Sequence, residues 1–203
     1  MSIGTDSLAM APQISLFAGA VITLLAGSFL PRTRQWVSRA LAVAALLVCS
    51  SLAIVALVGA PRRVFDGTFA ADDTTSIVAL IICGATLLVI ALGVDELQGS
   101  DRESESYVLL LLAALGALLM AGTTDLLVLI VAFLLASIPL YALIGLARTP
   151  VAAEATLKTY LLGALFGIGL MLGVTVLYGA GGATAYAELA QVFDVQAPEE
   201  GWI

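Results

Sequence analysis

Six long runs with almost no charge constrain this chain more than any other feature of its sequence. A helix that crosses a bilayer needs about 20 apolar residues, because its backbone polar groups find no water in the hydrocarbon. The runs therefore predict an all-α integral membrane protein in which about six transmembrane helices form a bundle. The runs cover residues 11–30, 40–58, 77–94, 107–122, 126–147 and 155–180, within one helical domain over residues 1–203 that ends in a short amphipathic tail at 184–203.

The overall composition excludes other classes of protein. Hydrophobic residues make up 61% of the chain, charged residues make up 11%, and the mean hydropathy is +1.10. A soluble domain is about 25% charged, and a globule of this size could not hide so much apolar surface from water. The composition excludes a soluble enzyme and a disordered tail. The formal net charge of −7, without a cluster of Lys and Arg, also argues against nucleic acid as a partner and leaves the lipid bilayer.

The runs contain few residues that could carry chemistry. The chain has no histidine, which is the commonest metal ligand and the usual proton shuttle near neutral pH. Cys49 and Cys83 lie inside apolar runs, so they are interpreted as small buried hydrophobic residues and not as a disulfide or a metal site. We find no pairing of a nucleophile with a base. We therefore expect no metal site, no catalytic residue and no catalyst acting alone, but a part of a larger membrane assembly.

Lys158 is the only charge well inside a run, and Glu154 precedes it by one helical turn. An ionisable residue in a membrane helix is a functional candidate by default. The spacing, with the acidic residue first, favours an ion pair along the helix. Two interpretations remain open at this point. Lys158 is either an interfacial anchor whose long side chain reaches the membrane surface, or a residue of a proton path.

Proline and glycine residues in the fifth and sixth runs predict packing features. Pro139 removes a backbone donor and is expected to kink the fifth helix. The motifs Gly163-x-x-x-Gly167 and Gly169-x-x-x-Gly173 allow close helix approach. Because the two motifs point to different faces, we expect the sixth helix to be packed from two sides.

The connections predict the orientation and the loops. Basic residues in short loops stay on the cytoplasmic side. One set of loops holds five of them and the other set two, so both termini are expected on the outer side of the plasma (inner) membrane. We expect residues 95–105 to form a solvated loop, and Thr124 or Asp125 to cap the fifth helix. The two sets of basic residues are Arg32, Arg34, Arg39, Arg102 and Arg148, and Arg62 and Arg63.

The second half of the chain resembles a known family. Residues 154–160 read Glu-Ala-Thr-Leu-Lys-Thr-Tyr, and the other matching stretches are residues 105–111, Gly116, 125–127, 137–141 and 177–179, with a weaker match at 64–73. In order and spacing they resemble the antiporter-like subunit N of bacterial NADH–quinone oxidoreductase (complex I). Residues 154–160 are similar to that family's Glu-Ala-x-x-Lys-Tyr signature, and residues 64–73 to its short extended segment.

The resemblance implies the N-terminal part of that family's fold and a function in the membrane arm. It implies a subunit that takes part in, or braces, proton translocation coupled to quinone reduction, with other membrane-arm subunits as partners. This chain would bind no cofactor, and quinone, FMN and iron–sulfur clusters would lie on partner subunits. The family's signature lysine falls on Lys158, which makes this residue and Glu154 the proton-path candidates.

Two departures from the family leave alternatives open. The family has a glutamate in its fifth helix at the position of Leu134, and its fold continues through a broken helix that carries another lysine. One alternative is therefore a structural or assembly subunit without a proton path of its own. Another is a component of a cation/proton antiporter complex, whose large subunits resemble the same family.

Overall fold

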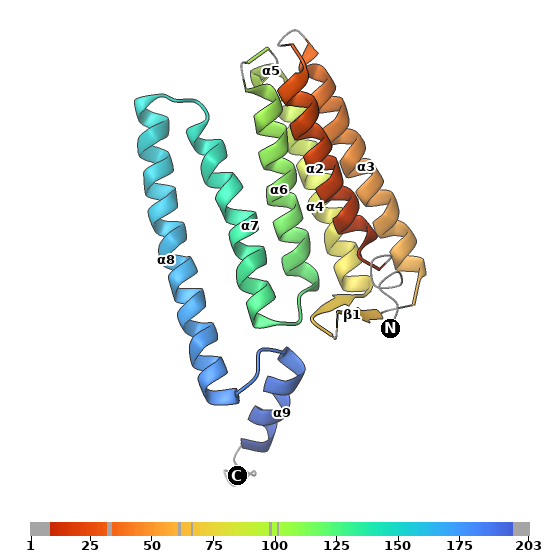
Figure 1. Ribbon diagram of the computed structural model, residues 1–203, viewed down its shortest axis with the longest axis vertical. Helices are drawn as coiled ribbons and strands as arrows, with labels where there is room; N and C mark the ends of the chain where they lie inside the picture. Colours follow the sequence, from red (N-terminus) through yellow and green to blue (C-terminus); the bar gives the residue numbers. More distant parts are fainter. Residues whose placement is uncertain are drawn as a thin grey trace.

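The computed structural model describes residues 9–31, 34–60, 62–65, 67–97, 99–100 and 102–196. Six helices in this part of the chain are long and apolar enough to cross a membrane (Figure 1). The all-α membrane fold with six spanning helices is thereby confirmed. The six are α2 (Ala11–Phe29), α3 (Trp36–Val58), α4 (Asp73–Leu92), α6 (Glu103–Gly122), α7 (Leu126–Gly145) and α8 (Pro150–Gly181).

Four of these helices begin four or five residues earlier than the apolar runs predict, namely α3, α4, α6 and α8. For α4 and α6 the reason is that a polar first turn, residues 73–76 and 103–106, belongs to the helix although it does not belong to the apolar run. The carboxylate of Asp72 accepts a hydrogen bond from the backbone N–H of Thr75 at the start of α4. The hydroxyl of Thr149 accepts one from Ala152 N–H at the start of α8. Such caps satisfy backbone donors that have no partner within the helix.

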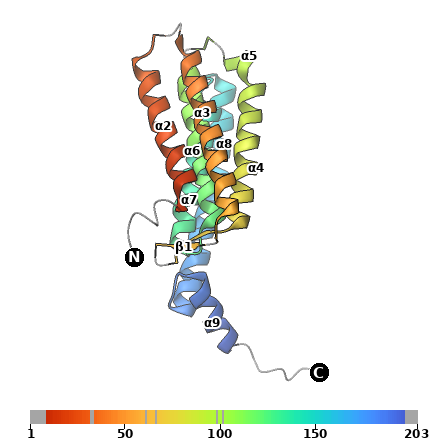
Figure 2. The ribbon, with the colours of Figure 1, turned by 90° about the vertical axis from the view of Figure 1, so that its right-hand side faces the viewer.

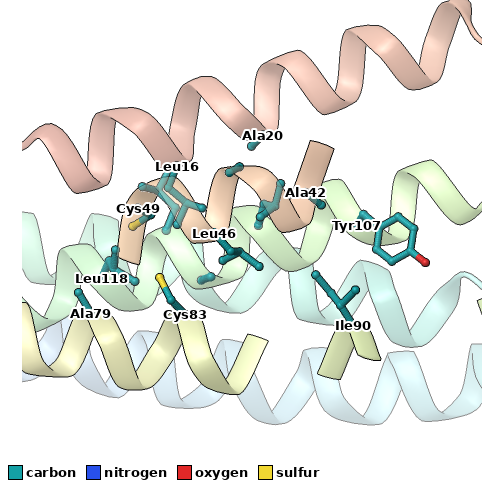
Figure 3. Close-up of a cluster of buried hydrophobic side chains, with 14 of the residues drawn as sticks. Leu16, Ala20, Ala42, Leu46, Cys49, Ala79, Cys83, Ile90, Tyr107 and Leu118 are labelled. Carbon is teal, nitrogen blue, oxygen red and sulfur yellow. The ribbon is translucent and has the colours of Figure 1, made fainter. Parts of the chain in front are cut away.

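Helices α2, α3, α4 and α6 pack around one core and form what we call the four-helix unit (Figure 2). Large side chains fill the core, and alanines let the helices approach one another. Cys49 on α3 and Cys83 on α4 are free and buried within it, as the sequence predicts, and lie on adjacent helices (Figure 3). The fully buried large side chains include Leu16, Leu46, Ile90, Tyr107, Leu111 and Leu118.

The remaining spanning helices are added in series to α6. Helix α7 packs on α6, and α8 packs on α7, so both extend away from the four-helix unit (Figure 1). Gly116 on α6 allows the first of these contacts. A Cβ atom there would overlap the backbone of Ala136 and lie 2.6 Å from the carbonyl carbon of Leu135. The backbones of α6 and α7 therefore touch at this glycine.

A short β-hairpin and two turns join at one end of the bundle. Strands β1 (Arg62–Val64) and β2 (Phe69–Ala71) are antiparallel, and Phe69 pairs with Thr123. The backbone N–H of Thr124 donates to Thr68 O at 3.0 Å, and that of Leu126 donates to Thr184 O at 2.9 Å. We call these paired segments, residues 62–71, 123–126 and 184–186, the backbone belt. The hairpin occupies the region that resembles the family's short extended segment, of which Asp66 lies outside the described residues.

Two short helices complete the described chain. Helix α5 (Val94–Leu97) occupies part of the stretch 95–105 that we expected to be a solvated loop. Helix α9 (Tyr186–Gln196) lies within the predicted amphipathic tail and packs against the end of α8. Residues 197–203 of that tail lie outside the described residues.

Candidate functional site on α8

Glu154 and Lys158 form the ion pair that their spacing predicts. Lys158 Nζ lies 2.5 Å from Glu154 Oε1, one turn apart on α8. The lysine side chain is 70% exposed and the glutamate side chain 64% exposed. No other helix of the described chain covers the pair. An exposed pair of this kind contributes little to the stability of the fold.

The length of α8 places this pair relative to a bilayer. With 32 residues, α8 is about 48 Å long at 1.5 Å per residue, whereas a bilayer's hydrocarbon core is about 30 Å thick. Lys158 lies about 12 Å from the helix start at Pro150. The helix exceeds the hydrocarbon by about 18 Å, so its first turns can reach the membrane surface. The geometry is thus compatible with both the anchor and the proton-path interpretation.

Small residues determine how α8 contacts α7. The aromatic rings of Tyr141 on α7 and Tyr160 on α8 pack edge to face, with centroids 5.9 Å apart. The hydroxyl of Tyr141 lies over Gly163, where a Cβ atom would overlap it, and Phe133 lies 3.5 Å from the Cβ position of Gly167. The first glycine motif therefore faces α7.

The second glycine motif has open space around it. No described atom lies within 4 Å of a Cβ placed at Gly169 or Gly173, outside the backbone of α8 itself and the neighbouring residues. Only Gly167 and Val174 of α8 are buried. Packing from two sides stays a prediction for α8, with one side occupied by α7 and the other free for a neighbour.

Helix α7 carries no carboxylate. Pro139 is buried inside it, and the hydroxyl of Ser137 donates to Phe133 O at 2.6 Å. Leu134, which stands where the resembled family has glutamate, is a half-buried apolar residue. Helix α7 therefore offers Lys158 no acidic side chain.

Our expectation that residues 95–105 form a solvated loop is wrong for Glu103. This residue opens α6 and is only 2% exposed. Its carboxylate accepts hydrogen bonds from Gly99 N–H at 3.1 Å and from the Tyr107 hydroxyl at 3.4 Å. Arg39 of α3 lies close to the same hydroxyl. The sequence pattern that could have predicted this burial is an acidic residue, Glu103, one turn before a tyrosine, Tyr107, at the start of a helix.

Asp125 connects α7 to the backbone belt. It caps α7 as predicted, because Oδ1 accepts from Leu127 N–H at 2.8 Å and from Val128 N–H at 3.2 Å. Its Oδ2 also accepts from the Thr184 hydroxyl at 2.6 Å, a contact that the sequence did not reveal. Burial raises the pKa of Asp125, but the hydrogen bonds from Thr184, Val128 and Leu127 outweigh it, so this pKa lies below its usual value.

Within the described ranges, no group of three or more His, Cys, Asp or Glu side chains lies close enough to hold a metal ion. The structure does bring together an exposed ion pair on α8 and, at opposite ends of α6, the buried carboxylates of Glu103 and Asp125.

Comparison with known proteins shows what the chain is similar to. The family model described as NADH:quinone oxidoreductase/Mrp antiporter, TM, matches residues 123–202. NADH-quinone oxidoreductase subunit N of Mycobacterium sp. (strain JLS) is 50% identical over 184 residues, which are 90% of this chain and 39% of that subunit. The chain is thus similar to part of subunit N. Subunit N 1 of Streptomyces griseus subsp. griseus is 44% identical over 191 residues, covering 94% of this chain and 40% of its own length.

Two solved structures of respiratory membrane complexes are also similar to this chain. A chain of respiratory complex I from Thermus thermophilus with bound aureothin matches with a TM-score of 0.73 and 30% identity, over 91% of this chain and 42% of that one. A chain of the membrane-bound sulfane sulfur reductase, an archaeal respiratory membrane complex, gives a TM-score of 0.73 at 25% identity, over 92% and 39%. This chain thus spans about two-fifths of the subunit N relatives that it matches.

Proposed function

We propose that this chain is a membrane-arm subunit of a proton-translocating NADH–quinone oxidoreductase, where it takes part in or braces proton translocation coupled to quinone reduction. The 50% identity to a subunit N over 90% of the chain carries this proposal, and the shared fold supports it. The partners are other membrane-arm subunits. Quinone, FMN and iron–sulfur clusters lie on partner subunits and not on this chain.

Within this function, Lys158 is the proton-path residue and Glu154 its partner. The charge is 70% exposed on a helix that buries only two residues. A lysine that faces lipid must reach the membrane surface or bear a cost that rises to about 2.5–3.5 kcal/mol at the bilayer centre, and a polar protein surface against the same face removes that constraint. We infer that further helices of the family fold cover this face of α8. They also supply the acidic acceptor that Leu134 cannot provide.

A bracing function without its own proton path is the second candidate, and the absence of a carboxylate on α7 favours it. A place in a cation/proton antiporter complex is the third, because the matching family model includes Mrp antiporters. The relatives named subunit N favour the oxidoreductase over the third candidate.

We further propose that the chain lies in the plasma (inner) membrane with both termini on the outer side. Arg34, Arg39, Arg102 and Arg148 lie at or just before the starts of α3, α6 and α8, which are at the same end of the bundle as α5. The hairpin at the opposite end carries Arg62 and Arg63 (Figure 1). Basic residues favour the cytoplasmic side. Arg32, which belongs to the larger set, lies outside the described residues.

The first experiment is gentle purification of the native assembly through a tag on this chain, followed by mass spectrometry. Recovery of flavin and iron–sulfur subunits with the chain is the expected result. Recovery with antiporter subunits alone would contradict the oxidoreductase and favour the third candidate.

A second experiment separates the proton path from bracing. Lys158→Met is expected to lower the number of protons pumped per quinone reduced in inverted membrane vesicles, while the complex still assembles. Arg63→Met, which also removes an exposed cation, is the matched control. Unchanged pumping and unchanged assembly in the lysine variant would leave bracing as the function.

A further inference from the structure

A hollow lies where α5, the start of α6 and the end of α7 meet (Figure 1). Its volume is about 420 Å³, which falls in the range of small-molecule sites in proteins. Leu143, Leu146 and Ala147, at the end of α7, form an apolar part of its lining. The rest of the lining includes two residues of opposite charge, Glu96 and Arg102. We call this hollow the α5 pocket.

The α5 pocket lies at the level where the helices leave the hydrocarbon. Helices α6 and α7 have 20 residues each, so each is about 30 Å long and matches the thickness of a bilayer's hydrocarbon core. Arg102 directly precedes α6, and Leu143 and Leu146 lie at the other end of α7. The charged part of the pocket is therefore at the level of lipid headgroups, and its leucines lie at the edge of the hydrocarbon.

Arg102 can be reached from this pocket. Its side chain is 23% exposed. A guanidinium group has five N–H donors, and the hydrogen bond from Nη1 to Leu146 O at 3.0 Å is the one that the described residues show for it. Glu105 Oε2 lies 4.0 Å from its Nε, beyond hydrogen-bond distance. The group thus keeps donors for a phosphate oxygen, a ligand that suits its planar arrangement.

Glu96 restricts what such a phosphate can carry. Its side chain is exposed on α5 and lines the same pocket as Arg102. A carboxylate repels a headgroup whose only charge is negative, whereas it accepts hydrogen bonds from an ammonium group. A primary ammonium has three N–H donors, and a quaternary ammonium has none. The two charges together favour a headgroup that joins a phosphodiester to a primary ammonium.

We propose that the α5 pocket binds one molecule of phosphatidylethanolamine. The phosphodiester lies on Arg102, the ammonium group lies on Glu96, and the start of an acyl chain lies against Leu143 and Leu146. The pocket contains residues of this chain alone and does not depend on the function proposed above.

The test measures which phospholipid the full chain retains. The protein is reconstituted in vesicles of equal parts phosphatidylethanolamine, phosphatidylglycerol and phosphatidylcholine with identical acyl chains. It is then extracted with detergent and examined by native mass spectrometry at rising detergent concentration. Wild type is expected to keep one lipid per chain after the others have left, with phosphatidylethanolamine in about threefold excess over either competitor, the size of effect typical of an exposed ion pair.

Two charge variants test the two ends of the headgroup. Glu96→Gln is expected to retain phosphatidylethanolamine and phosphatidylcholine equally, since it loses the ammonium contact. Arg102→Gln is expected to retain every lipid about tenfold less well, because it loses a charged hydrogen bond. Asp95→Asn removes a neighbouring exposed acid of α5 outside the pocket, and Arg34→Gln removes an exposed cation beside α3. Both controls are expected to behave as wild type.

A third variant tests the pocket without changing a charge. Ala147→Leu narrows it and is expected to lose the lipid, whereas Ala142→Leu makes the same change at an exposed position of α7 outside the pocket and is expected to keep it. Arg102 also donates to Leu146 O, so its variant counts only if circular dichroism shows unchanged helix content. Among the described residues Glu96 and Ala147 have no such side-chain contact, and their variants decide the matter by themselves.

Four results would overturn the proposal. Equal retention of the three lipids by wild type would indicate adventitious lipid only. An unchanged preference for phosphatidylethanolamine in Glu96→Gln would remove the ammonium contact, and full retention in Ala147→Leu would place the lipid elsewhere. A photocrosslinker at Leu143 that reacts with a protein and not with lipid in native membranes would show that a partner chain occupies the pocket.

Discussion

The helices of the four-helix unit and the α7–α8 pair are similarly apolar but have different surroundings. In the four-helix unit, α6 buries more than half of its residues, and its side chains meet three neighbouring helices. Helix α8 buries only Gly167 and Val174, and the core near it contains only three buried residues, Leu126, Val174 and Leu189. Both regions are apolar enough to cross a membrane. Apolarity therefore predicts that a helix spans the bilayer but not whether protein or lipid surrounds it.

The positions of small residues distinguish the two regions better than the positions of apolar residues. In the four-helix unit they lie between packed helices, as Ala20, Ala42 and Ala45 do. On α8 they lie against one neighbour at Gly163 and face open space at Gly169. Because lipid tails are as apolar as leucine, close packing drives helix association in membranes. The open glycines on α8 thus indicate a surface suited to another helix.

The largest expected effect on stability comes from comparing the loss of one leucine side chain in each region. Leu46→Ala, at a fully buried position, is expected to lower the free energy of unfolding by about 2–5 kcal/mol, because it leaves a cavity. Leu162→Ala, at a position that is 57% exposed on α8, is expected to change it by less than about 0.5 kcal/mol. Denaturant unfolding of the purified chain in mixed micelles measures both. Equal losses would show that α8 has a core of its own.

The joint between the two regions gives the next largest effect. Gly116→Leu forces a side chain into the backbone of α7 and is expected to cost about 1–3 kcal/mol. Limited proteolysis should then cut near α7 and α8 while α2, α3 and α4 stay protected. Gly84→Leu is the control, because a Cβ atom at that glycine of α4 meets no described atom within 4 Å. Simultaneous cleavage of all helices would mean that the regions do not unfold separately.

Asp125 tests whether the backbone belt stabilises the α7–α8 region. Its pKa is lower in the folded chain than its usual value of about 3.9. The stability that the carboxylate contributes is therefore present above about pH 4 and is lost as the pH falls through the lower, folded pKa. Asp125→Ala is expected to cost about 1–2 kcal/mol at pH 7. The difference from wild type should shrink in acid.

Thermal unfolding between pH 2 and 7 measures this prediction. Asp72→Ala removes the cap of α4 and serves as the comparison, because the Asp72 carboxylate accepts from the backbone N–H of Thr75 and, among the described residues, from no residue of the belt. A gap between wild type and Asp125→Ala that stays constant over this range would contradict the assigned hydrogen bonds to the ionised carboxylate.

The smallest effect concerns Tyr186 at the start of α9. Burial raises the pKa of its hydroxyl, and the negative charge of Asp125 raises it further. The stability associated with the neutral hydroxyl is present below its unfolded pKa of about 10 and is lost as the pH rises through the folded value. Asp125→Asn is expected to lower the pKa of Tyr186. Ultraviolet titration, with Tyr186→Phe subtracted, measures it, and an unchanged pKa would place the two groups too far apart to interact.

The sequence predicts the elements of this fold better than their surroundings. The number of spanning helices, the Glu154–Lys158 pair and the cap at Asp125 follow from local rules, which need only a few neighbouring residues. The burial of Glu103 and the bond between Asp125 and Thr184 do not, because both depend on segments that meet only in the folded chain. The proton-path role that we propose for Lys158 rests on family resemblance and not on its geometry.

The backbone belt also has a consequence for the order in which the chain is made. The hydroxyl of Thr124 donates to Gly67 O, 57 residues earlier, and Thr184 reaches back 59 residues to Asp125. Because a ribosome delivers a chain from its N-terminus, the hairpin can meet Thr124 as soon as α6 has entered the membrane. The second contact must wait until all of α8 has been synthesised. During that interval α7 has a neighbour on only one side. The speed of translation through residues 126–184 therefore determines how long α7 can pack against an incorrect partner.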